Sequence, residues 1–409
     1  VVVEEGRFES LEEMEEKAEA SPFIHLVNLL IKNAIRDGVS DVHIEPDLGC
    51  LRVRYRIDGL LKEINQLPMA YHGAVVSRLK IMANLDIAER RVPQDGRIRI
   101  NVDAASVDLR LSTMPTVLGE KVVLRILDKR RTVMDLDKLG FNAEILEGFK
   151  DALRKPSGLV LVTGPTGSGK TTTLYSAINM LNSMEKNLIT IEDPVEYQFN
   201  FINQVQVSDK TGLSFAKVLR AVLRQDPDIV MVGEIRDRET AEIAIQASLT
   251  GHLVISTLHT NDAPGAVTRL IDMGVEPFLV ASALSGVLAQ RLLRKICPEC
   301  KTMYYPGDEV LALLGVEGNK QFKIGRGRGC DACYDTGFKG RAGVHEFFAV
   351  GDEARKAIMR EATLDELRAL RERQGYFSLR QDALDKVRRG LTSMEEVTRV
   401  LYAEGDVDY

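Results

Sequence analysis

The amino-acid sequence predicts an α/β protein, in which a central domain with a parallel sheet follows a smaller α+β domain and precedes a cysteine module and C-terminal helices. Four short, almost wholly apolar segments (LVLVTG, LITIED, DIVMVGE and HLVISTL) alternate with helical segments between Gly158 and Lys295. Such strands are typical of a parallel sheet that is covered on both faces. The first of them runs directly into the glycine-rich stretch GPTGSGKTTTL. Functional side chains should therefore gather at the carboxyl ends of the strands.

Length and composition limit the domain count and the class of protein. The chain has 409 residues, 44% of them apolar, which suits two or three domains because single cores stop growing at about 250 to 300 residues. A net charge of −6 argues against a surface built for nucleic acid. No run approaches the roughly 18 apolar residues of a membrane helix. We expect a soluble, cytoplasmic protein that does not bind nucleic acid.

The region before the central domain has three predicted parts. Residues 1–20 are an acidic linker or first helix, and the start at Val1 fits a further N-terminal domain before it. Residues 21–130 are predicted to be α+β, because SPFIHLVNLLIKNAIRDG is a helix pattern with Ser21 as N-cap and LRVRYRIDG alternates as a strand does. Residues 131–145 are predicted to be a linker that leads into the central domain, residues 146–295.

The stretch after the first central strand matches the phosphate-binding pattern G-x-x-x-x-G-K-[ST]. In this pattern backbone N–H groups surround the phosphates, and the helix N-terminus adds partial positive charge. The lysine reaches the outer phosphates and the threonine hydroxyl binds Mg²⁺. The expected ligands are therefore ATP or ADP with Mg²⁺. The predicted nucleotide-binding residues are Gly164, Pro165, Thr166, Gly167, Ser168, Gly169, Lys170, Thr171 and Thr172.

Hydrolysis needs carboxylates beside the phosphates, and two further strand ends supply them. One carboxylate can orient or deprotonate the attacking water, while another holds the metal through water. A third strand lies between two histidines that are placed to sense the outer phosphate. A single acid or histidine after a strand is usually a capping or loop residue, so the hypothesis depends on three strand ends converging. The candidates are Glu192, Asp193, Glu196, Glu234, His252 and His259.

Several segments together resemble a known family. GPTGSGKTTTLY, TIEDPVEY, LRQDPDIVMVGEIRD and TGHLVISTLHTNDAPGAVTRL are similar to the Walker A, Asp-box, Walker B and His-box segments of the ATPases that power type II secretion and type IV pilus assembly. The resemblance covers about residues 21–409. It implies a PAS-like N-terminal domain before a RecA-like P-loop domain, assembled as a homohexameric ring at the cytoplasmic face of the inner membrane. The implied partner is an inner-membrane platform protein, through which the ring associates peripherally with the membrane.

The resemblance also assigns roles at the strand ends. Glu192 matches the position of the general base. Glu234 matches the Walker B acid, which together with Thr171 is implied to bind Mg²⁺. His252 and His259 match the pair of the His box.

Arginines complete the implied site. VDLRLSTMPTVLGEKVVLRIL places Arg110 and Arg125 at the positions from which the family's N-terminal domain reaches the phosphates. An arginine there neutralises charge on the transferred phosphoryl group, whereas the alternative interpretation is a solvated arginine on a strand. Weaker matches are Arg220, Arg224 and Arg341.

Four of the five cysteines form two C-x-x-C pairs within the module at residues 296–345. Disulfides are rare in a reducing cytoplasm, so the pairs predict four thiolates around one tetrahedral Zn²⁺. Four protein ligands leave no open position, which makes the predicted zinc structural. The ligands are Cys297, Cys300, Cys330 and Cys333, and residues 346–409 are predicted to be a C-terminal helical region.

The resemblance therefore implies a hexameric ATPase motor that drives pseudopilus assembly and export in type II secretion. Type IV pilus extension is the alternative, although many ATPases of that branch resemble GKTVSLY where this chain has GKTTTLY. A pilus-retraction motor is disfavoured because the cysteine module is typically absent there. Outside this family, a nucleic-acid motor and a zinc-stabilised scaffold without turnover are the competing hypotheses.

Overall fold

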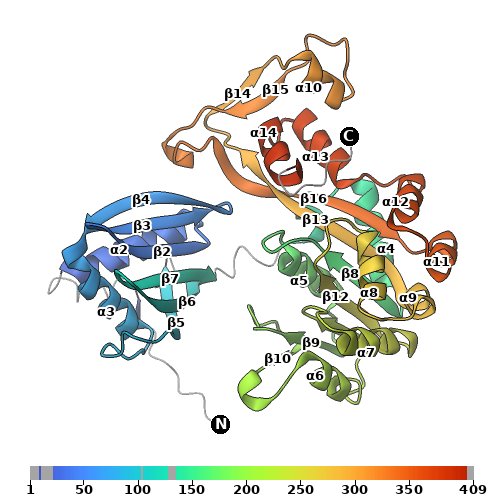
Figure 1. The fold of residues 1–409 in the computed structure, drawn as a ribbon, viewed down its shortest axis with the longest axis horizontal. Helices are drawn as coiled ribbons and strands as arrows, with labels where there is room; N and C mark the ends of the chain where they lie inside the picture. The colour runs from blue at the N-terminus through green and yellow to red at the C-terminus, as the bar shows by residue number, and fades with distance from the viewer. Residues whose placement is uncertain (1–8, 11–21, 103–104, 128–134, 403–409) are drawn as a thin grey trace. The chain divides into compact units, whose positions relative to one another are not determined.

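The computed structural model describes residues 9–10, 22–102, 105–127 and 135–402. The chain divides into two compact units, Val1–Thr132 (unit 1) and Val133–Tyr409 (unit 2) (Figure 1). The Ser21 cap, the acidic segment 1–20 apart from two residues, and the first part of the 131–145 linker lie outside the described residues. Within the described ranges, every helix is too short or too polar to cross a bilayer.

Unit 1 is a sheet with two helices packed on one face. The strands run in the order β1-β5-β6-β7-β2-β3-β4, and all neighbours are antiparallel except β1 and β5. The elements are β1 (Glu9–Ser10), α2 (Pro22–Arg36), β2 (Asp41–Asp47), β3 (Cys50–Ile57), β4 (Leu60–Pro68), η2 (Met69–Tyr71), α3 (His72–Met82), β5 (Gln94–Val102), β6 (Ala105–Thr116) and β7 (Gly119–Leu127).

The core of unit 1 lies between this sheet and its helices. Leu51, Val53 and Tyr55 are buried in one cluster with residues of α2 and α3, which confirms the predicted alternation along this strand. The Tyr55 hydroxyl donates to the carbonyl of Leu30 in α2 at 2.7 Å. The opposite face of the sheet is consequently left to charged side chains.

Unit 2 contains a seven-stranded sheet, a two-stranded ribbon and helices. Its first half consists of η4 (Leu136–Lys138), α4 (Ala143–Arg154), β8 (Gly158–Thr163), α5 (Lys170–Leu181), β9 (Leu188–Glu192), β10 (Asn203–Gln206), η5 (Asp209–Thr211), α6 (Phe215–Val222), β11 (Ile229–Val232), α7 (Arg238–Leu249), β12 (Leu253–Leu258), α8 (Gly265–Asp272) and α9 (Pro277–Ala283). Its second half consists of β13 (Leu284–Ile296), β14 (Lys301–Tyr304), α10 (Asp308–Leu313), β15 (Ile324–Gly327), η6 (Asp331–Cys333), β16 (Phe338–Ala349), α11 (Asp352–Met359), α12 (Leu364–Arg373), α13 (Leu379–Arg388), α14 (Met394–Val397) and η7 (Thr398–Tyr402).

The large sheet has the order β10-β9-β11-β12-β8-β13-β16, and its first six strands are parallel. Leu159 and Leu161 of β8 pack in one cluster with residues of α6, α7 and α9. Because successive side chains of a strand point to opposite faces, Val160 and Val162 of the same strand lie on the other face, and all four are fully buried. The prediction of a parallel sheet covered on both faces is confirmed.

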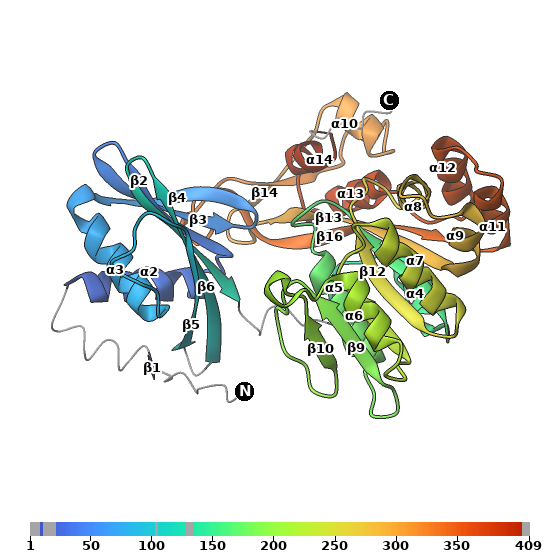
Figure 2. The ribbon, with the colours of Figure 1, turned by 60° about the horizontal axis from the view of Figure 1, so that its bottom comes forward.

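Two long strands complete this sheet, and the second of them, β16, lies beyond residue 295. β13 pairs in parallel with β8, and the antiparallel β16 closes this edge. β13 and β16 run side by side toward the small ribbon of β14 and β15 (Figures 1 and 2). The predicted C-terminal helical region, residues 346–409, therefore starts inside β16, which ends at Ala349.

Candidate functional site

The glycine-rich loop connects the carboxyl end of β8 to the start of α5. Gly164 and Gly169 have φ of 145° and 91°. A Cβ on Gly164 would lie 2.5 Å from the carbonyl oxygen of Gln290, and one on Gly169 would lie 2.9 Å from the Gln290 side-chain nitrogen. Only glycine fits both positions. The loop can therefore turn tightly and present its backbone N–H groups at the start of α5, as a phosphate site requires.

Lys170 is the first residue of α5 and folds back over this loop. Its ammonium donates to the carbonyls of Gly164 at 2.6 Å and Pro165 at 3.1 Å. Burial lowers the pKa of Lys170 to about 8, and the nearby charge of Arg291 acts in the same direction. An anion bound in the loop would offset this desolvation, because opposite charge favours the charged form of an ammonium.

Gln290, on β13, holds the phosphate loop from the side and was not predicted from the sequence. Its side chain is 2% exposed. The amide donates to the carbonyl of Ser168 at 2.6 Å and accepts from the hydroxyl of Thr173 at 2.7 Å. The one available signal was a polar residue within an apolar run, since a buried amide must find partners.

Glu234 and His259 meet just beyond the ends of β11 and β12. Glu234 Oε2 lies 3.6 Å from His259 Nε2, and Glu234 Oε1 lies 2.5 Å from Arg236 Nη2. Burial lowers the pKa of His259, and the charge of Lys170 lowers it further. The structure thus brings Glu234 and His259 together, with the charge of Lys170 near enough to favour the neutral form of the imidazole.

Glu192 ends β9 and is 4% exposed. Its Oε1 accepts from the Thr190 hydroxyl at 2.6 Å and from the Gln204 amide at 3.0 Å, and its Oε2 accepts from the Tyr175 hydroxyl at 2.5 Å. The backbone N–H of Gly233 donates to the carbonyl of Ile191 at 2.8 Å. The ends of β9 and β11 are therefore joined, and Glu192 lies at the same sheet edge as Glu234.

His252 lies elsewhere in unit 2. It precedes β12, whose first residue pairs with Gly158 at the start of β8, whereas the phosphate loop follows the end of that strand. His252 Nδ1 is 2.9 Å from the carbonyl oxygen of Ala247. The two histidines are thus separated by the whole of β12, whose six residues span about 20 Å at 3.3 Å per residue, and the structure does not bring His252 to the loop of its own chain.

The remaining acids and arginines of unit 2 are on its surface or beside the site. Asp193 is exposed directly after β9, and the backbone N–H of Glu196 donates to the Tyr175 hydroxyl at 3.2 Å. Arg220 is exposed and pairs with Glu239 at 2.6 Å. Arg224 donates to the carbonyl of Arg220 at 2.8 Å, and Arg341 is exposed on β16 opposite Arg294.

Arg110 and Arg125 belong to unit 1, where they lie directly opposite one another on β6 and β7. The next strand along places Asp41 opposite Arg125. The Asp41 carboxylate accepts from Arg125 Nε at 3.0 Å, and its side chain is only 9% exposed. A buried acid therefore fixes one of the two predicted arginines on the charged face of the sheet, a link that the sequence did not predict.

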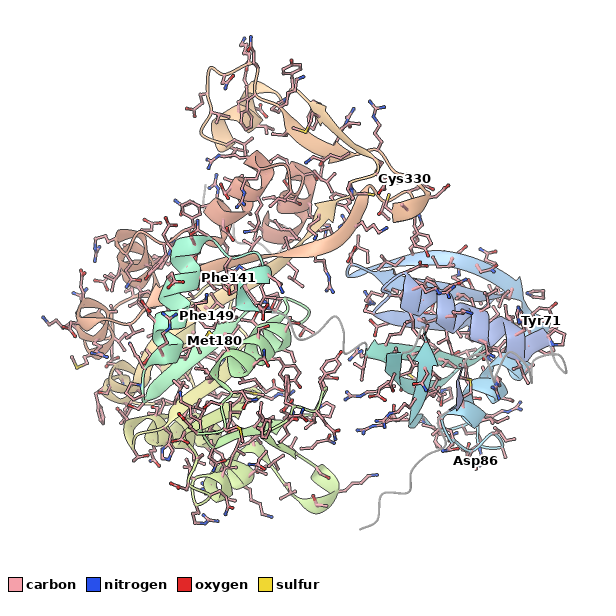
Figure 3. All side chains as sticks on the ribbon, turned by 180° about the vertical axis from the view of Figure 1, so that it is seen from behind. Tyr71, Asp86, Phe141, Phe149, Met180 and Cys330 are labelled. Carbon is pink, nitrogen blue, oxygen red and sulfur yellow. The ribbon has the colours of Figure 1, made fainter. Side chains whose placement is uncertain are left out.

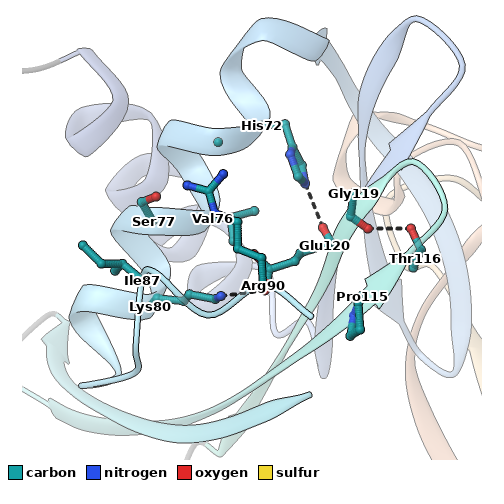
Figure 4. Close-up of a pocket in the computed structure, with 11 residues that line it drawn as sticks. His72, Val76, Ser77, Lys80, Ile87, Arg90, Pro115, Thr116, Gly119 and Glu120 are labelled. Carbon is teal, nitrogen blue, oxygen red and sulfur yellow. Dashed lines mark hydrogen bonds and ion pairs between the residues drawn. The ribbon is translucent and has the colours of Figure 1, made fainter. Parts of the chain in front are cut away.

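Unit 1 also contains a pocket of about 240 Å³ beside α3 and the β6–β7 hairpin (Figure 4). Lys80, which is fully buried, pairs with Glu120 at 2.6 Å and donates to the carbonyl of Glu89 at 2.6 Å. His72 Nε2 lies 2.8 Å from the carbonyl oxygen of Glu120. The buried charges of this pocket are thus matched within the unit itself.

The four predicted cysteines form one cluster. Their Sγ atoms all lie within 4.8 Å of one another, and Cys297–Cys330, Cys300–Cys333 and Cys330–Cys333 are separated by 3.9, 3.9 and 3.7 Å. Four thiolates bound to one zinc at about 2.3 Å would be about 3.8 Å apart. Figure 3 labels Cys330 in this part of the chain.

The chemistry of the cluster also suits a metal. Burial raises the pKa of the Cys333 thiol, but backbone N–H groups of Gly337 and Cys330 outweigh this effect and lower it to about 7. Both N–H groups lie 3.3 Å from the sulfur. Since metals bind the thiolate, these donors favour at Cys333 the form that a metal requires, whereas burial raises the pKa of the Cys330 thiol to about 12.

The parallel sheet, the phosphate loop and the carboxylates at the adjoining strand ends define a P-loop nucleoside triphosphatase. The family model described as "Type II/IV secretion system protein" matches residues 16–399. The chain belongs to this family.

Relatives of known name lie in two branches. The chain is 50% identical to the type II secretion system ATPase E of Vibrio cholerae over 389 residues, which is 95% of this chain and 77% of that protein. It is 51% identical to the type IV pilus assembly ATPase PilB of Myxococcus xanthus over 393 residues, which is 95% of this chain and 69% of that protein.

Solved structures support the same fold. The pilus retraction motor PilT with bound ADP is 28% identical, with a TM-score of 0.60 over 90% of this chain and 95% of that one. DotB of Legionella pneumophila has a TM-score of 0.67 over 93% of this chain and 96% of that one at 21% identity, and shows the likeness of the fold alone.

Proposed function

We propose that this chain is an ATP-hydrolysing motor of type II secretion, which drives pseudopilus assembly and protein export. The observation that carries the proposal is the contact of Glu234 with His259 at the strand ends, together with a glycine-rich phosphate loop over which Lys170 folds. The family match over nearly the whole chain and the ATPase names of relatives at about half identity support hydrolysis of ATP.

In the proposed mechanism the loop N–H groups and Lys170 bind the outer phosphates of ATP. Glu192 orients or deprotonates the attacking water. Glu234 holds the side chains of Arg236 and His259 beside the reacting groups. Mg²⁺, held by Thr171 and Glu234, would neutralise phosphate charge when bound. His259, whose pKa is lowered by burial and by the charge of Lys170, can accept or donate a hydrogen bond at the outer phosphate in its neutral form.

The arginines of unit 1 belong to the same proposal. Arg110 and Arg125 would reach the outer phosphate and neutralise charge that develops there during transfer. Unit 1 would then be the PAS-like domain and residues 146–295 the RecA-like domain of a homohexameric ring. Contacts made chiefly to the outer phosphate would couple hydrolysis to domain movement.

The proposed partner is a platform protein of the inner membrane, through which the ring would stand at the cytoplasmic face. Type IV pilus assembly is the second candidate function, because the PilB of Myxococcus xanthus is as similar as the secretion ATPase of Vibrio cholerae. Nucleic acid is not part of the proposal, given the net charge of −6.

The proposed function is tested by pairing ATPase rates with sedimentation. The chain should hydrolyse ATP with or without added DNA, and it should sediment as a hexamer with a non-hydrolysable ATP analogue. Turnover per chain should rise with protein concentration as the ring forms, because a ring site needs its neighbours. Full turnover by a strictly monomeric chain would contradict the ring, and strong stimulation by DNA would favour a nucleic-acid motor instead.

We also propose that the cysteine cluster holds one structural Zn²⁺. Purified chain should contain about one zinc, and Cys297→Ser should lose it and lower the melting temperature by about 5 to 10 °C. Nucleotide binding should persist, because the phosphate loop lies outside the cluster. Cys50→Ser is the matched control, since Cys50 is a free, half-buried thiol on β3. Elemental analysis that finds no zinc in reduced parent protein would contradict this prediction.

A further inference from the structure

Tyr175 connects the phosphate loop to the carboxylate of Glu192. It lies on α5, the helix that begins with Lys170, and its side chain is fully buried. Its hydroxyl donates to Glu192 Oε2 at 2.5 Å and accepts from the backbone N–H of Glu196 at 3.2 Å. One hydroxyl therefore joins the loop helix both to the end of β9 and to the segment that follows it.

The three donors to Glu192 differ in where they come from. Thr190 is on the same strand as Glu192, and Gln204 is on β10, directly opposite Thr190. Of the three, only Tyr175 is carried by the helix that ends the phosphate loop. Any shift of this helix would therefore reach the carboxylate through Tyr175, while the other two donors belong to the sheet edge.

The environment of Tyr175 keeps its hydroxyl a donor. Burial raises its pKa well above the usual range, and the negative charge of Glu192 raises it further. The ring packs edge-on against Tyr197 and Phe199, with centroids 6.0 and 5.0 Å away. These rings fix the direction of the hydroxyl, so removing its oxygen alone leaves the packing in place.

We infer that Tyr175 is a positioning residue for hydrolysis, which sets the orientation of the Glu192 carboxylate relative to the bound phosphates. The inference rests on the proposed role of Glu192. It assigns a task to the tyrosine of GKTTTLY that neither the phosphate pattern nor the names of the relatives contains. Tyr175 itself would touch neither nucleotide nor water.

The test is a double-mutant cycle on the full-length chain with Tyr175→Phe, Glu192→Gln and both together. Tyr175→Phe should lower kcat by about tenfold, the scale of one hydrogen bond to a charged group, and leave ADP affinity within about threefold of the parent. In the Glu192→Gln background the same change should have no further effect on kcat, because its target has gone. Tyr55→Phe is the matched control, because it removes another buried tyrosine hydroxyl, which donates to the carbonyl of Leu30 in unit 1, and it should keep kcat within about threefold of the parent.

Each outcome has a distinct meaning. Loss of kcat by Tyr175→Phe that disappears in the Glu192→Gln background supports the inference. An equal loss in both backgrounds, or no loss in the parent background, overturns it while leaving the role of Glu192 intact. Parental kcat in Glu192→Gln alone would instead remove Glu192 from the mechanism, and the inference would fall with it. Melting temperatures of all variants check that the lost acceptor for the Glu196 N–H has not unfolded the chain.

Discussion

Glu234→Gln is expected to bind ATP but to hydrolyse it at least about 100-fold more slowly than the parent, the scale of losing a charged group that acts in the transition state. Glu234 is only 16% exposed and lies within 2.5 Å of Arg236 and 3.6 Å of His259. Glutamine keeps the shape of this contact and removes the charge. Steady-state turnover and ATP titration on the same preparation separate the loss of kcat from any loss of binding.

Two further variants make this result specific. Lys170→Ala should lose nucleotide affinity itself, because its ammonium is the cation folded over the phosphate loop. Glu242→Gln is the matched control, since this acid on α7 also pairs with an arginine, at 2.7 Å, but lies within a helix and away from the strand ends. Parental kcat in Glu234→Gln, or an equal loss in Glu242→Gln, would contradict the assignment.

Arg110→Ala and Arg125→Ala are each expected to lower the ATPase rate by at least about 100-fold, the range found for arginines that neutralise transferred phosphoryl groups. ADP affinity should stay within about threefold of the parent, because the proposed contact is to the phosphate that ADP lacks. The pair lies across two strands and Asp41 holds Arg125 in place. Turnover and ADP titration are measured on the same variants.

The control for the arginine pair is Arg99→Ala. Arg99 lies on the neighbouring strand β5, two residues along from the position opposite Arg110, and pairs with Asp108 at 2.6 Å. It is therefore a strand arginine with an acidic partner but without a proposed phosphate contact, and should retain parental turnover. If all three variants behave alike, the effect belongs to the charge of the sheet face and the specific role of Arg110 and Arg125 is lost.

The sequence was most informative where local chemistry determines the structure. The apolar run before Gly164 predicted a strand buried on both faces, and the glycine spacing predicted a tight loop before a helix. The convergence of Glu234 and His259 followed from parallel topology, which places carboxyl ends at one edge. The same topology explains why His252, at the opposite end of its strand, lies away from the loop.

What the sequence could not supply were partners distant along the chain. Gln290 reaches Ser168 across more than a hundred residues, and nothing in its local pattern reports that contact. Tyr175 appeared only in the segment that resembles the Walker A box, and its hydrogen bond to Glu192 exists only because β9 ends beside α5. Asp41 likewise meets Arg125 through strand order alone. Such contacts depend on long-range pairing, which periodicity does not encode.

β13 joins the phosphate loop to the metal ligands within one continuous strand of 13 residues. Gln290, near the middle of β13, donates to the Ser168 carbonyl of the phosphate loop. Cys297 directly follows Ile296, the last residue of the strand. Between the two places lie the ladder of β13 with β16, which is irregular between Arg294 and Ile296, and the buried pair of Arg294 with Glu396 at 2.7 Å. Linked binding equilibria are reciprocal. If a bound nucleotide changes the affinity of the four thiols for their metal ion by some factor, the bound metal ion changes the affinity of the phosphate loop for the nucleotide by the same factor.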